Sequence, residues 1–581
     1  MFWEGIVRNR LTHFGALLFA VSLCLVPGAE AQSHAVASYQ LSARGQAALN
    51  RLSQLNSIPA SDWIYRAGDL PQAESADLDT SGWQGVVLPF RASTETVWLR
   101  RWVTIPQSLN GYDPSGARVW FHLSLESTGP GPEYAYQLLY IDGVRVAEGQ
   151  HVERRVLFAH ARPGEKVLIA VKLLATQYEK SIEAAELTLD AIEGRPSPDD
   201  LLKEIQSAAQ VLPAVATSRE ELDAQEQTLE FAAAQIDMGA LDRNDQSAFD
   251  VSLGKAQAAL GPLKPLLQKL SVDMTGNAHI DAAWLWTKSE TVDQVHFTFA
   301  DALRLMNEYP QYTFAQSTSQ YSEWMEEKFP EVFKGIQQRV KEGRWELVGG
   351  MWVEPDFNLP DGEAEVRQLL VGTRYLHSRF GVDVQVGWNP DSFGYSWQLP
   401  QVYKKSGIDF FLTQKMVENE VNPLPLKLFW WQAPDGSRVL TYIPHDYVLD
   451  IDPVDIASDL ARAVKMNPGE EEMLHLHGPS YGRLLMEGAR AVLDTGEHWA
   501  QPDKVYPAMH FGTAERFFRD AASRIAAESP VWSYRTAAEG NVALPQPPAG
   551  EITVPTWKDE LYLEHHRGTY TTQAAQKRNI R

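Results

Sequence analysis

Residues 386–415 have the sequence VGWNPDSFGYSWQLPQVYKKSGIDFFLTQK, in which two apolar runs flank a short amphipathic stretch. The runs ending at Trp388 and beginning at Asp409 are rich in β-branched and aromatic residues, which predicts strands. The stretch between them is predicted to be helical and to end at Gly407, since glycine commonly follows the last turn of a helix. Strand, helix and strand in this order predict two parallel strands joined by a crossover helix.

The same alternation covers the middle of the chain. SVDMTGNAHID, YTFAQSTSQ and RWELVGG have the pattern of strands, whereas EEKFPEVFKGIQQRVKEG and GEAEVRQLLVGTRYLHSRFG have the pattern of helices. We therefore expect residues 271–525 to form a parallel α/β, barrel-like catalytic domain. In such folds a site forms just beyond the carboxyl ends of the strands.

Two further segments precede this domain, which makes the expected fold class multidomain α/β. Residues 55–195 contain short alternating runs bounded by glycine, proline or aspartate, which predicts an N-terminal β-sandwich. Residues 197–270 are predicted to be a helical connector, because Ser197 can cap a helix and Pro198 suits its first position.

The first residues have the pattern of a targeting segment. Arg8 and Arg10 precede the apolar stretch GALLFAVSLCLVPG and then Ala-Glu-Ala, so residues 1–31 are predicted to be a signal peptide cleaved after Ala31. An uncleaved membrane anchor is the alternative, although the apolar stretch is short for a bilayer. Cys24 is the only cysteine, so the mature chain has no disulfide, and a bacterial periplasmic or secreted location is expected.

Composition limits the partners. The 581 residues have a formal net charge of −23, 44% hydrophobic and 22% charged residues. These values are typical of globular domains and argue against stable membrane insertion of the mature chain. The acidic balance argues against a nucleic-acid partner, because a phosphate backbone is bound by a basic face. A homo-oligomer remains open.

Polar residues follow five of the predicted strands. His279 and Asp281 have a spacing that places both side chains on the same side of an extended chain, where they could bind one cation. Such a pair is usually structural when it stands alone, and Asp391 alone could equally be a turn residue. The strand-end rule brings these residues into one cleft with other polar side chains, namely Gln320, Glu354, Asp356 and Lys415.

Four long and highly specific motifs occur in the second half of the chain. They are AHIDAAWLW, ELVGGMWVEPDFNLPDGE, GWNPDSFGYSWQLPQVYKKSGIDFFLTQK and WKDELYLEHHRGTYTTQAAQKRNIR. Together they resemble glycoside hydrolase family 38, the α-mannosidases, in particular the group with an N-terminal β-domain. The resemblance covers about residues 275–581 in the family's order.

The resemblance implies an exo-acting retaining α-mannosidase that hydrolyses terminal α-mannosides or mannose-containing glycans with a bound zinc ion. Asp391 would be both the nucleophile and a zinc ligand. The implied ligand set is His279, Asp281, Asp391 and His566, with His565 as the alternative to His566. Two histidines and two aspartates suit zinc, although another divalent ion could also bind.

The resemblance also implies a sugar site around the metal. Trp284 would be the aromatic floor beneath the sugar, and Glu354, Asp356 and Lys415 would bind the substrate or support the ligands. The alternative is that these three charged residues form ion pairs that only stabilise the fold.

Two features depart from the family. The loop that carries the general acid is shortened to HLHGPSYG and contains no aspartate, so His477 or Asp446 would have to replace it. The family also continues beyond Arg581, so residues 526–581 are predicted to be the start of a truncated helical bundle. A catalytically impaired, sugar-binding protein is therefore the alternative function, and a different zinc hydrolase such as a deacetylase is a third.

Overall fold

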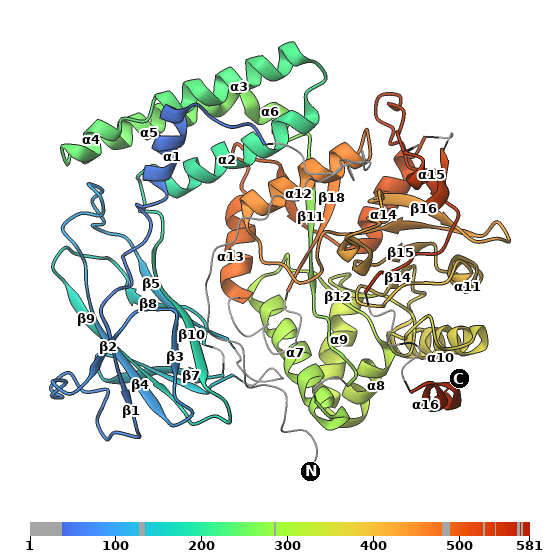
Figure 1. Cartoon of the computed structure of the whole chain (residues 1–581), viewed down its shortest axis with the longest axis horizontal. Helices are drawn as coiled ribbons and strands as arrows, with labels where there is room; N and C mark the ends of the chain where they lie inside the picture. Colours follow the sequence, from blue (N-terminus) through green and yellow to red (C-terminus); the bar gives the residue numbers. More distant parts are fainter. Residues whose placement is uncertain are drawn as a thin grey trace, which may run out of the picture. The chain divides into compact units, whose positions relative to one another are not determined.

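The structure is a computed structural model, and Figure 1 shows its elements. The predicted signal peptide lies outside the described residues, as do Trp284 and His566. The described chain has the mixed α/β composition that the sequence predicts. The structure describes residues 38–126, 134–150, 152–283, 286–478, 489–526, 529–540, 542–565, 570 and 573–580.

Two antiparallel sheets form the β-rich part of the chain. The rings of Trp63 and Phe121 lie 5.9 Å apart and belong to different sheets, so the sheets share one core. The six-stranded sheet has the order β2 (Gln84–Val86), β1 (Trp63–Ala67), β4 (Val97–Thr104), β9 (Lys166–Leu173), β6 (Gln137–Ile141) and β7 (Val144–Gly149). The four-stranded sheet has the order β3 (Phe90–Ala92), β10 (Lys180–Leu189), β5 (Val119–Glu126) and β8 (Arg155–Phe158).

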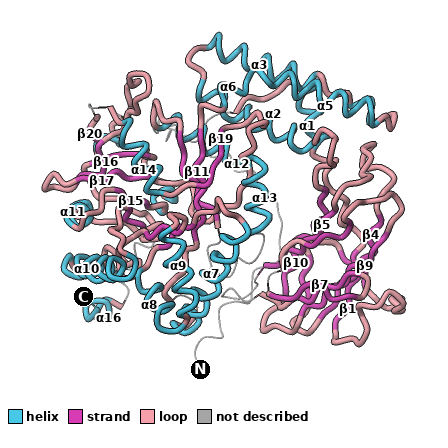
Figure 2. Tube along the Cα trace, turned by 180° about the vertical axis from the view of Figure 1, so that it is seen from behind, coloured by secondary structure: helices cyan, strands magenta, loops and turns pink. Residues whose placement is uncertain are grey.

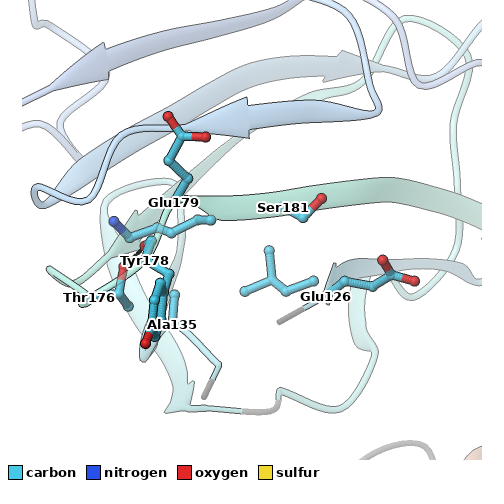
Figure 3. Close-up of a pocket in the computed structure, with 8 residues that line it drawn as sticks. Glu126, Ala135, Thr176, Tyr178, Glu179 and Ser181 are labelled. Carbon is cyan, nitrogen blue, oxygen red and sulfur yellow. Dashed lines mark hydrogen bonds between the residues drawn. The ribbon is translucent and has the colours of Figure 1, made fainter. Parts of the chain in front are cut away.

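A small pocket lies where β5 ends and β10 begins (Figure 3). Its central space is about 10 Å³, which is room for about one water molecule. Lys180 at its edge donates to the carbonyl oxygens of Ser93 at 2.7 Å and Glu95 at 2.6 Å, so this buried amine is already paired. The pocket is therefore a packing feature between β5 and β10 and offers no space for a sugar.

The helices between residues 198 and 267 begin as the sequence predicts. The Ser197 hydroxyl accepts the backbone N–H of Asp200 at 3.1 Å, and Pro198 stands in the first turn. The Glu204 carboxylate, buried on the first of these helices, accepts the N–H of Val505 at 2.9 Å, which ties the helices to the α/β part. The elements are α2 (Pro198–Val215), α3 (Arg219–Ala234), α4 (Met238–Asp242), α5 (Gln246–Leu260) and α6 (Lys264–Leu267), joined by α1 (Ala43–Leu52) from the start of the chain.

Two sheets form the α/β part. In the first, all strands are parallel, as predicted, in the order β13 (Trp345–Leu347), β12 (Phe314–Gln316), β11 (Ser271–Asn277) and β18 (Glu472–His477), and β19 (Ala508–Phe511) also pairs with β11. The second has the order β14 (Val386–Trp388), β15 (Phe410–Leu412), β17 (Arg438–Tyr442), β16 (Leu428–Gln432), β21 (Thr556–Trp557) and β20 (Val531–Trp532). The Gly349 N–H donates to the Val386 carbonyl at 2.7 Å, so the end of β13 lies beside β14.

Helices surround these strands, as Figures 1 and 2 show from opposite sides. The predicted long helix ending at Gly343 is divided into two, because Pro330 cannot donate a backbone hydrogen bond inside a helix. The helices are α7 (Lys288–Glu308), α8 (Ser319–Lys328), α9 (Pro330–Lys341), α10 (Gly362–Phe380), α11 (Leu399–Lys405), α12 (Pro453–Met466), α13 (Ala489–Trp499), α14 (Ala514–Arg524), α15 (Tyr534–Ala538) and α16 (Ala574–Ile580).

Two strands follow residue 525, where the sequence predicted a helical region to begin. β20 and β21 pair with each other in parallel, and β21 pairs with β16 in the second sheet. β16 itself runs antiparallel to β17, so this sheet is mixed rather than parallel throughout. Within the described residues, the structure contains no helix that is both long and apolar enough to cross a bilayer.

Candidate active site

His279 and Asp281 lie just beyond the carboxyl end of β11, with their side chains together. The His279 Nε2 atom is 3.6 Å from Asp281 Oδ1 and 3.2 Å from Asp391 Oδ2. The imidazole is 8% exposed and Asp281 is half-buried. The strand-end rule therefore brings together three of the four predicted metal ligands, and the fourth, His566, lies outside the described residues.

The loop after β14 holds Asp391 by its backbone. Its N–H donates to Glu354 Oε1 at 3.0 Å, and the Ser392 hydroxyl donates to the same oxygen at 3.3 Å. Gly394 in this loop has a φ of +103°, and a Cβ atom there would lie 3.1 Å from the Leu561 carbonyl oxygen. Only glycine fits both the conformation and the space, which explains its place in the NPDSFGY motif.

Lys415 keeps the Asp391 carboxylate ionised. Its Nζ atom lies 2.9 Å from Asp391 Oδ1 and 2.7 Å from Glu418 Oε1. Burial by itself would raise the pKa of Asp391, but the contacts with His279 and Lys415 outweigh it and lower the pKa to about 2. A carboxylate held in this form is suited to act as a nucleophile or as a metal ligand.

The cluster has the properties of a cation site. The buried His279 Nε2 atom has no hydrogen-bond partner, although it faces two carboxylates. On the other side of the ring, His279 Nδ1 is 3.4 Å from Glu354 Oε2, the position in which a carboxylate orients a metal-binding imidazole. Burial opposes protonation of His279, yet the nearby carboxylates of Asp281, Asp391 and Glu354 together raise its pKa to about 10. A bound divalent ion would replace this proton. His279, Asp281 and Asp391 can hold such an ion, and His566 remains a prediction.

Glu354 and Asp356 have different surroundings, although both follow β13. Burial raises the pKa of Glu354 to about 7, and its contacts are with His279 and the backbone of Asp391. Asp356 Oδ1 instead accepts the N–H groups of Asn358 at 2.7 Å and Leu359 at 2.9 Å, as in a tight turn. The structure thus brings Glu354 to the cluster and gives Asp356 a local role in its loop.

The end of the chain returns to this region. The Tyr395 N–H donates to the Leu561 carbonyl at 2.8 Å, and the Tyr570 hydroxyl donates to the Phe393 carbonyl at 3.1 Å. His565, the alternative fourth ligand, places its Nε2 atom 2.9 Å from the carbonyl oxygen of Glu418. His565 is therefore engaged with the Lys415 turn, and Leu561 and Tyr570 contact the loop of Asp391.

The sequence interpretation missed Tyr447. Its ring lies 5.3 Å from the His279 ring at an angle of 79°, and its carbonyl oxygen accepts the Asn277 side-chain amide at 2.9 Å. The Gln414 amide donates to the His445 carbonyl at 3.0 Å, so residues 445–447 border the cluster. The strand-end rule could have identified this segment, because it follows β17, which is parallel to β15, and therefore lies at the same edge of the sheet.

The two residues that could replace the missing acid have opposite environments. His477 is 3% exposed, its ring lies between Tyr312 at 5.8 Å and Phe511 at 6.0 Å, and burial lowers its pKa to about 3. An imidazole with this pKa is neutral near pH 7, and the N–H of a neutral ring is too weakly acidic to protonate a leaving group. Asp446 is half-buried and directly precedes Tyr447.

His477 also predicts an acid-sensitive fold. Because its pKa is lower in the folded than in the unfolded chain, it contributes stability above pH 6.5 that is lost as the pH falls. Between pH 7.5 and 5.0 this loss is expected to be about 2 kcal/mol. Urea unfolding should show a smaller loss for His477→Leu than for the wild-type chain over the same interval. Equal losses in both chains would contradict the assigned burial.

Residues 269–535 match the family model described as "Glycosyl hydrolases family 38 N-terminal domain". This part of the chain is similar to glycosyl hydrolase family 38. Curated relatives include the alpha-mannosidase of Saccharomyces cerevisiae, 34% identical over 315 residues, which are 53% of this chain and 27% of that protein. Alpha-mannosidase 2C1 of Homo sapiens is also 34% identical over 315 residues, which are 54% of this chain and 27% of that protein.

A solved alpha-mannosidase from Enterococcus faecalis V583 matches with 16% identity and a TM-score of 0.38, covering 50% of this chain and 31% of that one. The chain spans about a quarter of the length of the curated relatives that it matches. The relatives are glycosidases, and the cluster of His279, Asp281 and Asp391 lies within the matched residues.

Proposed function

We propose that this chain is an exo-acting, retaining α-mannosidase that hydrolyses terminal α-mannosides and holds a zinc ion at His279, Asp281 and Asp391. The observation that carries the proposal is the position of Asp391. One of its oxygens faces Lys415 and the other faces the unpartnered nitrogen of His279. The same carboxylate can therefore be held ionised, oriented and placed beside a cation.

The two carboxylate oxygens support a two-step reaction. Asp391 attacks the anomeric carbon, the bond to the leaving oxygen breaks, and a covalent mannosyl ester of Asp391 forms. Water then cleaves that ester, so two inversions give overall retention. A divalent ion at this cluster would bind sugar hydroxyls and fix the orientation of the ring. Lys415 stabilises the returning carboxylate in the second step.

An acid must protonate the leaving oxygen, and we assign this role to Asp446. The buried, unprotonated His477 is unsuited to it, whereas Asp446 lies on the segment that borders His279 and Gln414. Asp446 would donate a proton to the leaving group and later accept one from the attacking water. The tyrosine that follows it packs against the metal-binding imidazole, which places this segment on the substrate side of the cluster.

The family resemblance also supports the finer architecture. We propose a β-sandwich, a helical connector and a barrel-like catalytic domain, in that order, with Trp284 and His566 completing the sugar and metal sites. Export to the periplasm or outside the cell after cleavage at Ala31 is proposed from the sequence of residues 1–31.

Metal analysis tests the site directly. The His279→Ala chain should contain about one divalent ion fewer than the wild-type chain, because a directly bound ligand is lost. The rate of hydrolysis of an aryl α-mannoside should fall together with the metal content. For the wild-type chain, NMR should show the α-anomer of mannose as the first product. His377→Ala is a matched control, since this exposed histidine on α10 pairs only with Asp383. Equal metal content in the wild-type and His279→Ala chains would refute the site.

A further inference from the structure

A second cluster of possible ligands lies toward the opposite end of β11 from His279. It consists of Asp273, Glu472 and His510, whose ligand atoms all lie within 4.8 Å of one another. We propose that these three residues form a second divalent-cation site, separate from the sugar site, that ties together the strands β18, β11 and β19. This inference does not depend on the proposed α-mannosidase activity.

The strand register builds the cluster. Asp273 is paired directly with His510 on one neighbouring strand and with Leu474 on the other. Glu472 stands two residues before Leu474, and residues two apart on a strand project from the same face. All three side chains therefore project from one face of three adjacent parallel strands. Such a set is positioned by the backbone and does not rely on flexible loops.

The buried carboxylate of Asp273 has an oxygen without a partner. Asp273 is fully buried, and its Oδ1 atom contacts both Arg516 and His510 Nε2, the latter at 2.7 Å. Its Oδ2 atom has no hydrogen-bond partner. An unpaired carboxylate oxygen in the interior is costly. A cation bound between Oδ2, Glu472 and one nitrogen of His510 would satisfy this oxygen.

The surrounding charges leave room for a cation. The Arg524 guanidinium is 2.8 Å from Glu470 and 3.6 Å from Glu472, so it pairs mainly with Glu470. Arg516 contacts Asp273. The three carboxylates of Asp273, Glu470 and Glu472 therefore outnumber the two guanidinium groups. One imidazole nitrogen and two carboxylate groups suit zinc, manganese or nickel better than calcium or magnesium, which prefer oxygen alone.

The competing state is a proton shared by the two carboxylates. Burial and the nearby Asp273 raise the pKa of Glu472 to about 8, so a proton could be held where we place the cation. The two states differ in what they require of His510. A shared proton needs only the carboxylates, whereas the cation site needs the imidazole as a third ligand.

The experiment uses the full-length His279→Ala chain, which removes the first site, and zinc alone as the probe. After chelation and titration, this chain is expected to bind about one zinc ion and to melt at a higher temperature with zinc than without it. Adding His510→Ala should weaken zinc binding at least about 100-fold, since loss of even an indirect supporting partner costs 10- to 100-fold. His510 is partly exposed, so the variant is expected to fold.

His498→Ala in the same background is the matched control, because this histidine on α13 pairs with Asp200 at a similar exposure. It should leave zinc binding unchanged. Glu472→Gln, which keeps the size of the side chain, should weaken binding as His510→Ala does. The proposal is overturned if the His279→Ala chain binds no zinc, or if it binds zinc equally well with and without His510.

Discussion

Asp391→Asn is expected to reduce turnover of aryl α-mannosides by at least about 10⁴-fold, because an amide cannot attack the anomeric carbon. The same change should abolish covalent labelling by a fluorinated mannosyl donor. The fold should survive, since the asparagine side chain still offers an oxygen to Lys415 and its backbone N–H still donates to Glu354. Initial rates and mass spectrometry of the intact protein measure the two effects.

Asp356→Asn provides the matched control for this prediction. The chemical change is identical, and the asparagine oxygen can still accept the two backbone N–H groups that Asp356 accepts. Activity should stay within about threefold of the wild-type value, because substitutions on the surface and in turns usually have small effects. A label that maps to Glu354 or another carboxylate would show that Asp391 is not the nucleophile. A large loss of activity in Asp356→Asn would indicate that Asp356 binds the substrate.

The strand-end rule explains why most of the cluster could be predicted from the sequence. His279, Asp391 and Lys415 follow β11, β14 and β15, and parallel strands bring the residues after their carboxyl ends to one edge. The contact of Lys415 with Asp391 follows from that rule, because β14 and β15 are parallel neighbours. The contact of Asp391 with His279 also requires the two sheets to lie side by side, as they do where β13 ends beside β14. The helix start at Ser197 was equally predictable, because a capping serine and a first-turn proline act locally.

Other features depend on contacts distant in sequence. β20 and β21 contain two residues each, too few for a periodic pattern, and they become strands because β21 pairs with β16 across more than a hundred residues. The antiparallel pairing of β16 and β17 does have a local sequence pattern, because Asp435-Gly436 between two apolar runs is typical of a hairpin. The separate roles of Glu354 and Asp356 depend on which carboxylate turns inward, and sequence spacing does not specify that.

The buried cluster of Asp273, Glu472 and His510 has the same origin. Asp273 and Glu472 are separated by about two hundred positions in the sequence. Each residue of the cluster is surrounded by the apolar sequence of an ordinary strand. A single buried charge in a strand is disfavoured unless it is paired. The pairing becomes visible only when β18, β11 and β19 are placed side by side, because register, and not local sequence, aligns the three side chains.

Asp446→Asn is expected to separate the two steps of the proposed reaction. General acid catalysis contributes about 10²- to 10⁴-fold and matters most when the leaving group is poor. A mannosyl-mannose bond should therefore be cleaved about 10²- to 10⁴-fold more slowly by the variant. An aryl mannoside with a very acidic phenol needs no proton, so its first step should survive and give a burst of phenol. Asparagine keeps an oxygen for the N–H groups of Tyr447 and Val448, so the turn should be preserved.

Azide distinguishes the role of Asp446 in the second step. Without a base to activate water, the mannosyl ester of Asp391 should accumulate and resolve slowly. Azide attacks without deprotonation, so it should speed the resolution in the Asp446→Asn chain, release mannosyl azide of retained configuration, and have little effect on the wild-type chain. Unchanged disaccharide cleavage in the variant would exclude Asp446 as the acid. A wild-type chain that binds mannose but releases no phenol from any aryl mannoside would instead favour a sugar-binding protein without turnover.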